Sequence, residues 1–264
     1  MFREWVKGVG NLVISQLPES RLLYRVCSRY VDRCNGENNC DLRANGELRL
    51  LKEKLPSCRT VFDVGANVGE WAALALSVNP TIDLHCFEPS RFTFSHLESN
   101  HFPPNVRLNN IALGSAKGET ELFLFGDGAG TNSLYPREGL TEHGIAGPIG
   151  RETVRLDTLD SYCDKHELRE IDFLKLDVEG HELETLKGAR AMLAHRRLKI
   201  IQFEFGGANI DARVFLMDIW KLFENLDYTF FKLFPDRIHP ILSYSQTLER
   251  FQYQNWAIVR NDGA

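Results

Sequence analysis

The stretch TVFDVGANVGEW, residues 60–71, combines the features of a strand, a glycine-containing loop and a helix. Its apolar start runs to Asp63, Gly65 and Gly69 follow in the loop, and helical spacing resumes near Val68. Glycines allow a tight turn and the close approach of a ligand to the backbone. The first turn of a helix offers free N–H groups and a positive dipole end. The stretch therefore predicts a site for an anionic or nucleotide-like ligand.

The loop lacks the two best-known fingerprints of phosphate-binding turns. From Gly65 it reads GANVG, which is neither GxGxxG nor a GxxxxGK[ST] phosphate loop. The next predicted strand, in DLHCFEPS, ends at Glu88, where an acid would hold a ribose diol. The alternative is that the glycines only shape a loop and that Glu88 is a surface acid. The ordered pair of motifs favours a nucleoside without a pyrophosphate.

Strand and helix patterns alternate along the chain from Cys58. Apolar runs predict strands at 60–64, 83–88, 106–110, 120–125, 172–177, 199–205, 228–234 and 255–260. Helical spacing predicts helices at 68–78, 91–99, 157–166, 181–194 and 211–226. Such alternation indicates a mostly parallel sheet with helices on both faces, and a ligand site at the carboxyl ends of its strands.

Two long stretches interrupt this alternation. Residues 125–150 are rich in glycine and residues 234–254 are rich in aromatic side chains. Connections of this length are uncommon, so the first is a candidate active-site loop. The aromatic side chains of the second are candidates for stacking on sugar rings, or they anchor the loop: Phe234, Tyr244, Phe251 and Tyr253.

Composition narrows the class of protein. The 264 residues carry a net charge of −5, which argues against nucleic acid as a partner. No uncharged apolar run approaches the roughly 18 residues of a membrane span. The first residues show no secretory signal, so a cytoplasmic protein is expected. Six cysteines form no CxxC pair, which predicts reduced structural thiols rather than a zinc site.

Residues 1–57 are predicted to form an N-terminal helical extension to a domain that covers residues 58–264. Within it Arg21, Arg25, Arg29 and Arg33 give one helix a basic bias. Such a helix would contact a membrane surface or an acidic partner; alternatively, it is a solvated helix face packed beside the core. The extension could also mediate dimerisation, or cover the acceptor site, and the sequence does not decide the oligomeric state.

Six motifs follow one another between residues 58 and 260: VFDVGANVGEW, CFEPS, NNIALG, VRLDTLD, DFLKLDVEGHELETLKGA and IIQFEFGG. Together they resemble the FkbM-type S-adenosylmethionine-dependent methyltransferases, and DVEGHE after the FLKL strand is the most specific element. The resemblance implies the class I methyltransferase (Rossmann-like) α/β fold, whose seven-stranded, mostly parallel sheet has an antiparallel last strand. It also implies O-methylation of a hydroxyl on a sugar, a polyketide or a similar acceptor, with S-adenosyl-L-methionine as cofactor.

The resemblance assigns cofactor-binding residues to three loops: Asp63, Gly65, Asn67 and Gly69; Glu88 and Pro89; and Asn110, Ile111 and Ala112. The first loop would lie under the methionine part of the cofactor. The second would hold the ribose hydroxyls, and the third would lie near the adenine. Asp177 would end the fourth strand, close to the cofactor's amino group or to the reacting centre.

The candidates for catalysis lie in LDVEGHE. Methyl transfer requires the acceptor oxygen in line with the methyl group at roughly 3–3.5 Å, and a positioned base helps by about 10² to 10⁴. Asp177, Glu179 and His181 are spaced by two, so an extended backbone would point all three to one side. His181 is the type best suited to proton transfer at neutral pH. Alternatively, these acids only cap the next helix, and Lys175 is expected to partner an acid within its strand.

Glu204, at the end of IIQFEF, should lie beside Asp177 if their strands are neighbours. The two acids would then hold a divalent metal, or Glu204 would bond the hydroxyls of the acceptor directly. The sequence leaves the metal unknown. Asn132 and His143 in the first insertion, and His239 in the second, are further candidates for acceptor contacts.

The preferred hypothesis is an O-methyltransferase acting on a sugar hydroxyl of a glycan or glycoconjugate. A polyketide or phenolic acceptor is the alternative, and it would need an apolar rather than a polar pocket. A NAD-dependent oxidoreductase conflicts with the missing GxGxxG. A non-catalytic nucleoside-binding module would bind the cofactor without forming a product.

Overall fold

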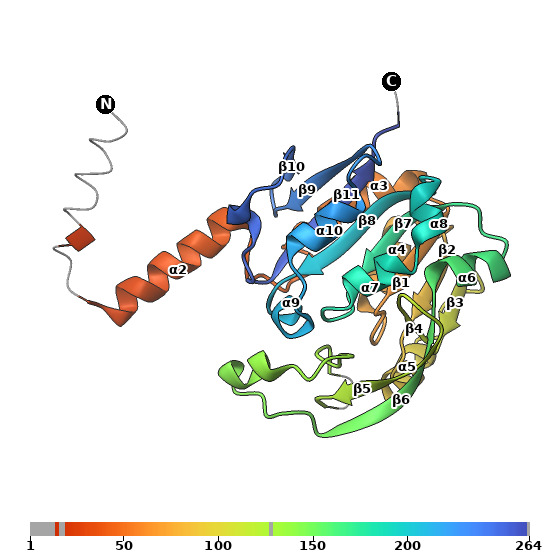
Figure 1. Cartoon of the computed structure of the whole chain (residues 1–264), viewed down its shortest axis with the longest axis horizontal. Coiled ribbons are helices and arrows are strands. Elements are labelled where there is room, and N and C mark those ends of the chain that lie inside the picture. Colours follow the sequence, from red (N-terminus) through yellow and green to blue (C-terminus); the bar gives the residue numbers. More distant parts are fainter. Residues whose placement is uncertain (1–13, 16–18, 127–128, 263–264) are drawn as a thin grey trace. The chain divides into compact units, whose positions relative to one another are not determined.

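The computed structural model describes residues 14–15, 19–126 and 129–262, and the chain divides into two compact units (Figure 1). The first unit is Met1–Asn35, whose main described element is the helix α2 (Arg21–Asn35). The second unit, Gly36–Ala264, contains the sheets. Within the described ranges, no helix is long and apolar enough to cross a membrane.

The second unit is built on an eight-stranded sheet with the order β10-β9-β11-β8-β7-β1-β2-β3. Five strands pair in parallel: β1 (Thr60–Val64), β2 (Asp83–Phe87), β3 (Val106–Asn109), β7 (Ile171–Leu176) and β8 (Leu198–Phe205). The last strand, β11 (Gln254–Arg260), is antiparallel to β8 and to β9 (Tyr228–Leu233). This order confirms the class I methyltransferase fold. The difference is an eighth strand, β10 (Ile238–Ile241), which pairs with β9 at the edge.

Helices cover both faces of this sheet, and each face has its own apolar core. Successive strand residues point to opposite faces, so Phe62 and Val61 belong to different clusters. The Phe62 side packs against α6 (Leu159–Lys165), α7 (Glu182–Lys187), α8 (Arg190–Ala194) and α10 (Leu216–Leu222). The Val61 side packs against α3 (Glu47–Lys54), α4 (Glu70–Val78) and α5 (Arg91–Ser99).

The compact unit begins at Gly36, so the domain boundary predicted at residue 57 lies inside it. Leu50, Leu51 and Leu55, from α3 and the short η1 (Leu55–Ser57), are fully buried in the core on the Val61 side. Residue Glu37 forms an isolated bridge with Gln254 at the start of β11. Residues 36–57 therefore fold with the sheet, and only the part before Gly36 is a separate unit.

Two predicted helices are shorter than expected. The helix predicted at 181–194 is broken into α7 and α8 at Gly188, where a side chain would stand 2.0 Å from the carbonyl oxygen of Gly114. The helix predicted at 211–226 is replaced by α9 (Gly207–Ala212) and α10. Glu249 accepts hydrogen bonds from two N–H groups in the first turn of α10, which fixes its start at Leu216.

A second, three-stranded sheet lies beside the main one, with the order β4-β6-β5 (Figure 1). It contains β4 (Ala112–Leu113), β5 (Gly118–Leu124) and β6 (Gly150–Asp157). The strand predicted at 120–125 thus belongs to this sheet and not to the central one. β5 and β6 pair along their length, and the first insertion, with the short η2 (Glu138–His143), connects their ends.

The loop after β1 crosses the loop after β7 at very close range. Gly65 has a φ of +86°, and a Cβ there would lie 1.8 Å from the carbonyl oxygen of Asp177. The N–H groups of Gly65 and Ala66 both donate to the carbonyl of Phe87 at 2.9 Å. Because only glycine fits both the φ angle and the space, this residue sets the spacing between the carboxyl ends of β1, β2 and β7.

We predict that Gly65→Ala lowers the free energy of unfolding by about 3 kcal/mol or more, because the methyl group collides with a backbone oxygen and the φ angle is strained. Urea unfolding followed by circular dichroism measures the change. Gly147→Ala is the matched control, since a Cβ there meets nothing within 4 Å, and its effect should stay within about 0.5 kcal/mol. Equal stability of the two variants would contradict this account of the loop.

Candidate functional site

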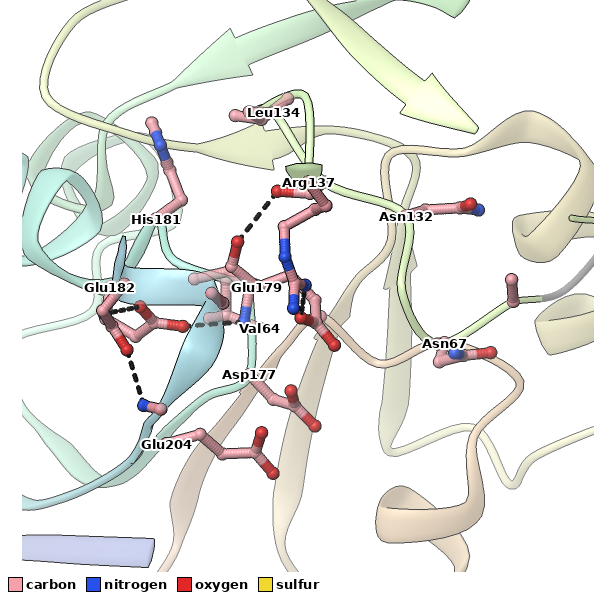
Figure 2. A pocket seen from close by; sticks show the side chains of 18 of the residues that line it. Val64, Asn67, Asn132, Leu134, Arg137, Asp177, Glu179, His181, Glu182 and Glu204 are labelled. Carbon is pink, nitrogen blue, oxygen red and sulfur yellow. Dashed lines mark hydrogen bonds and ion pairs between the residues drawn. The ribbon is translucent and has the colours of Figure 1, made fainter. Parts of the chain in front are cut away.

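A cavity of about 1220 Å³ opens at the carboxyl ends of β1, β2, β7 and β8. This is the edge at which parallel α/β sheets bind ligands. The volume exceeds the roughly 300–1,000 Å³ of ordinary small-molecule sites, so the cavity has room for more than one ligand. Its walls include the loop after β1 and part of the first insertion (Figure 2). Phe251 and Tyr253 of the second insertion also line it.

One end of the cavity is formed by the loop after β1 and by Glu88. Gly65 and Asn67 line it, and the N–H of Asn67 donates to Glu88 Oε2 at 3.1 Å. The N–H of Ser90 donates to Glu88 Oε1 at 2.9 Å. Burial raises the pKa of Glu88 to about 7, although these two backbone donors oppose the rise. The structure thus brings together the two motifs on which the nucleoside prediction depends.

Of the other residues predicted to hold the cofactor, some line the cavity and one supports the residues that line it. Pro89, Ile111 and Ala112 line the cavity. Asn110 supports the wall instead, because its side-chain amide donates to the carbonyls of Glu88 and Pro89, both at 2.9 Å. Asp63 and Gly69 are not among the described residues that line the cavity. Gly69 has a φ of 91° and caps the start of α4.

Asp63 instead belongs to a buried ion cluster around Lys175. The Lys175 ammonium lies 3.0 Å from Asp177 Oδ2 and 3.5 Å from Asp63 Oδ1. Burial raises the pKa of the fully enclosed Asp63, and the Lys175 charge limits that rise. Burial alone would lower the pKa of Lys175, but Asp177, Asp63 and Glu47 together raise it above its usual value. Lys175 therefore stays charged, and the prediction that it partners an acid is confirmed.

Glu204 lies beside Asp177, as predicted. Leu176 pairs with Phe203 across the two parallel strands, so the next residue of each strand carries a carboxylate at the same level. The hydroxyl of Tyr253 donates to Glu204 Oε1 at 2.7 Å. Burial raises the pKa of Glu204 well above its usual range, and the nearby charge of Asp177 adds to the rise. Tyr253, a candidate either for stacking on a sugar ring or for anchoring its loop, holds this carboxylate in place.

The three side chains of LDVEGHE do not point to one side, so that prediction is wrong. Glu179 and Gly180 have φ angles of 52° and 101°, which end the extended backbone directly after β7. In Figure 2, the ring of His181 points away from Asp177 and Glu204. The hydroxyl of Tyr135 lies 3.0 Å from His181 Nδ1, and burial lowers the pKa of this histidine to about 4.

Two glutamates, Glu182 and Glu179, stabilise the turn after β7 through different contacts. Glu182 accepts hydrogen bonds from the N–H groups of Val178 and Gly180, at 3.3 and 3.2 Å. Glu179 forms an ion pair with Arg137 of the first insertion, and burial raises the pKa of Glu179 to about 7 in spite of that partner. Both glutamates therefore act on the shape of the wall.

Arg137 is the site residue that the sequence did not reveal. Its side chain is only 9% exposed and lies between Glu179 and Asp211, with its Nε 3.4 Å from Asp211 Oδ2. Ser133 adds a hydroxyl that donates to the carbonyl of Glu179 at 2.8 Å. The first insertion is therefore held against the turn after β7 and lines the cavity, as a candidate active-site loop must.

The candidate acceptor contacts divide in a similar way. Asn132 lines the cavity, and its Oδ1 accepts the N–H of Phe125 at 2.9 Å. The side chain of His143 lies outside the described residues, and His239 is in β10, away from the described cavity wall. Of the four aromatic residues noted in the second insertion, Phe251 and Tyr253 line the cavity.

The sequence left open whether the site holds a metal ion. Among the described side chains, no three or more His, Cys, Asp or Glu residues are grouped so that they could hold one.

The residues at this end of the cavity fit S-adenosylmethionine. Glu88 offers carboxylate oxygens to the ribose hydroxyls, and Ile111 and Ala112 offer an apolar surface to the adenine. Asn67 Oδ1 is buried without a hydrogen-bond partner among the described residues, so a ligand donor there would satisfy it. Asp177 would place a carboxylate near the amino group of the cofactor or near the reacting centre.

Comparison with known proteins supports the same family. The family described as "Methyltransferase FkbM domain" matches residues 63–230. Three similar proteins are the 2-O-methyltransferase NoeI of Sinorhizobium fredii (30% identical over 52% of this chain), the hexuronic acid methyltransferase AglP of Haloferax volcanii (28% over 63%) and the 31-O-demethyl-FK506 methyltransferase FkbM of Streptomyces tacrolimicus (26% over 64%). The matches cover 60%, 65% and 68% of the length of those proteins.

Solved structures that resemble the chain include a METTL16 methyltransferase domain, at 12% identity and a TM-score of 0.47. That likeness covers 85% of this chain and 70% of the other. The fold class itself follows from the strand order of this chain, with β11 inserted antiparallel between β8 and β9.

We predict that Lys175→Met lowers the free energy of unfolding by about 3–5 kcal/mol, because the substitution leaves the buried Asp63 without its ion partner. Denaturant unfolding measures the loss. The double variant Asp63→Asn/Lys175→Met should lose less than the sum of its two single variants, since the second change removes the unpaired charge. Lys199→Met is the control, because the Lys199 side chain is 34% exposed, against 4% for Lys175, and Asp172 keeps hydrogen bonds from two backbone N–H groups without it. An equal loss in both lysine variants would disprove the role of burial.

Proposed function

Because this chain belongs to the FkbM methyltransferase family, we propose that it transfers the methyl group of S-adenosyl-L-methionine to a hydroxyl of a sugar in a glycan or glycoconjugate. The observation that carries the proposal is the neighbouring pair Asp177 and Glu204 on the wall of the cavity that Gly65 and Glu88 also line. One relative is named for a hexuronic acid, which supports a sugar acceptor.

In this proposal the cofactor lies along the ends of β1 and β2. Glu88 binds the ribose hydroxyls, Ile111 and Ala112 pack on the adenine, and Asn67 lies under the methionine part. S-adenosylmethionine supplies the methyl group as a sulfonium, and the protein orients the acceptor and excludes water around it. Asp63 acts indirectly, since it holds Lys175 and thereby Asp177.

We place the base at Asp177 rather than at His181. Lys175 binds Oδ2 of Asp177, which leaves Oδ1 for the hydroxyl of the acceptor. A positioned base of this kind contributes about 10² to 10⁴ in rate. His181 is less suited, because its ring points away from the two acids and its pKa is lowered to about 4 by burial. Glu204, held by Tyr253 through Oε1, offers its other oxygen to a second hydroxyl.

The polar wall favours a sugar over a polyketide as the acceptor. Beyond Asp177 the cavity is lined by Glu179, Arg137, Glu204 and Asn209, and carboxylates are good acceptors for the several hydroxyls of a sugar. The net charge of −5 supports a small-molecule or glycan acceptor rather than nucleic acid. The six free thiols support a cytoplasmic location.

We predict that Asp177→Asn lowers kcat by about 10² to 10⁴ and weakens the binding of S-adenosylhomocysteine by a much smaller factor, because the amide keeps the size of the side chain but not its basicity. Methyl transfer to a panel of oligosaccharides and phenolic compounds, followed by mass spectrometry, gives the rates. Asp236→Asn is the control, since its side chain is 71% exposed beside Arg237.

Product on phenolic compounds alone would favour the small-molecule alternative over the sugar. Tight cofactor binding without any product would favour a non-catalytic nucleoside-binding module. Full turnover by Asp177→Asn would show that Asp177 is not the base and that another group in the cavity has this role.

We also predict that the affinity for S-adenosylhomocysteine rises by about tenfold between pH 6 and pH 8. The pKa of Glu88 is raised to about 7 by burial, so below that pH the residue is mostly protonated, and ribose hydroxyls bind the ionised form better. Isothermal titration at several pH values measures the slope. Glu88→Gln should bind more weakly and show a flatter profile, whereas Glu98→Gln, exposed on α5, should keep the slope. If the affinity of Glu88→Gln still rises steeply between pH 6 and pH 8, the pH dependence comes from another titratable group.

A further inference from the structure

Helix α2 exposes an unusual amount of apolar surface. None of its 15 residues is buried. Leu22 and Tyr24 are each 74% exposed, Tyr30 is 69% exposed and Val26 is 57% exposed. Soluble proteins rarely present a continuous apolar patch of this kind unless another surface covers it.

Most of the apolar and basic residues lie on opposite sides of the helix, and Leu22 and Arg33 lie at the boundary between the two sides. At 3.6 residues per turn, one side carries the set Leu23, Val26, Cys27, Tyr30 and Cys34, at spacings of three, four, seven and eleven residues from Leu23. The other side carries Arg21, Arg25, Arg29 and Asp32. A short helix with such a division and a basic polar face is typical of helices that lie in the plane of a membrane surface.

The net charge also differs between the segment that contains α2 and the rest of the chain. Residues 1–35 contain six Lys or Arg and three Asp or Glu, which gives +3, whereas the whole chain is at −5, so residues 36–264 carry −8. A second copy of α2 packed on the apolar side would cover that side but would offer no negative partner to the arginines on the other. Nucleic acid would leave the apolar side uncovered and would be repelled by the acidic unit. An anionic bilayer satisfies both sides, because its phosphates attract the arginines and its acyl boundary accepts the leucine, valine and tyrosine side chains.

We propose that α2 binds flat on a membrane surface that contains anionic lipids. Its 15 residues would extend over about 22 Å, which is less than the roughly 30 Å of a hydrocarbon core, so the helix lies in the interface and does not span it. Tyr24 and Tyr30 suit the headgroup region, where amphipathic rings gather. This proposal does not depend on the proposed methyltransferase activity.

The test is co-sedimentation of the full chain with vesicles of phosphatidylcholine, with and without phosphatidylglycerol at about 30 mol%. We expect at least about tenfold more bound protein with the anionic vesicles, and a marked loss at high salt. Arg25→Glu/Arg29→Glu and Leu23→Ser/Tyr30→Ser should each reduce that binding by about tenfold or more, the first through charge and the second through apolar contact.

Arg107→Glu/Arg151→Glu is the matched control, because it changes the net charge equally through two arginines that are 53% and 59% exposed on the second unit. Its vesicle binding should stay within about twofold of the unchanged chain. All variants should keep their affinity for S-adenosylhomocysteine, which shows that they are folded. Equal binding to both kinds of vesicle, an equal loss in the control, or a dimer that needs α2 while vesicles are ignored would each overturn the proposal.

Discussion

The buried ammonium of Lys175 is the interaction on which the arrangement of the site depends. It joins the ends of two neighbouring strands, because Asp63 lies on β1 while Lys175 and Asp177 lie on and directly after β7. A charge enclosed in this way is tolerated only with opposite charges beside it. The cation in turn allows several carboxylates to lie close together at one edge of the sheet, where they would otherwise repel one another. Glu47 of α3, which accepts a hydrogen bond from Gln202, adds a further negative charge that favours the charged form of Lys175.

Much of this arrangement could be predicted because parallel strands place their carboxyl ends at one edge. Asp177 follows the buried apolar strand β7 and Glu204 lies near the end of β8, so their adjacency required only the correct strand order. The link between Glu88 and the glycine loop followed from the same reasoning. The eight predicted strands all exist within a residue or two of their expected bounds, because their apolar runs are continuous and flanked by loops.

The rest could not be predicted, because it depends on contacts between distant residues or on local backbone geometry. Arg137 and Glu179 are 42 positions apart, and Tyr253 and Glu204 are 49 apart; neither pair has a local pattern. β6 has a single buried residue, Val154, so its charged sequence gave little sign of a strand. The direction of His181 depends on two positive φ angles at Glu179 and Gly180, and only the glycine indicated such a turn. Residues 36–57 looked like part of the extension because they precede the first strand and continue the extension's helical pattern, while one of their contacts, that of Glu37 with Gln254, joins residues far apart in sequence.

Different kinds of chain segment form the wall of the cavity: the core βαβ unit and the two long insertions. Glu88 and the loop after β1 belong to the first βαβ unit, whereas Arg137 and Tyr253 come from the two insertions. Segments of the second kind vary readily in length and composition during evolution, since few core contacts constrain them. Changes in the insertions can therefore alter one part of the cavity while Glu88 and the loop after β1 stay the same. Each such change must, however, supply a new partner for Glu179 and for Glu204, because a buried carboxylate left alone would disturb the shared edge. Selection on the insertions is thus coupled to the scaffold at two defined points, and these two carboxylates are where compensating substitutions should accumulate.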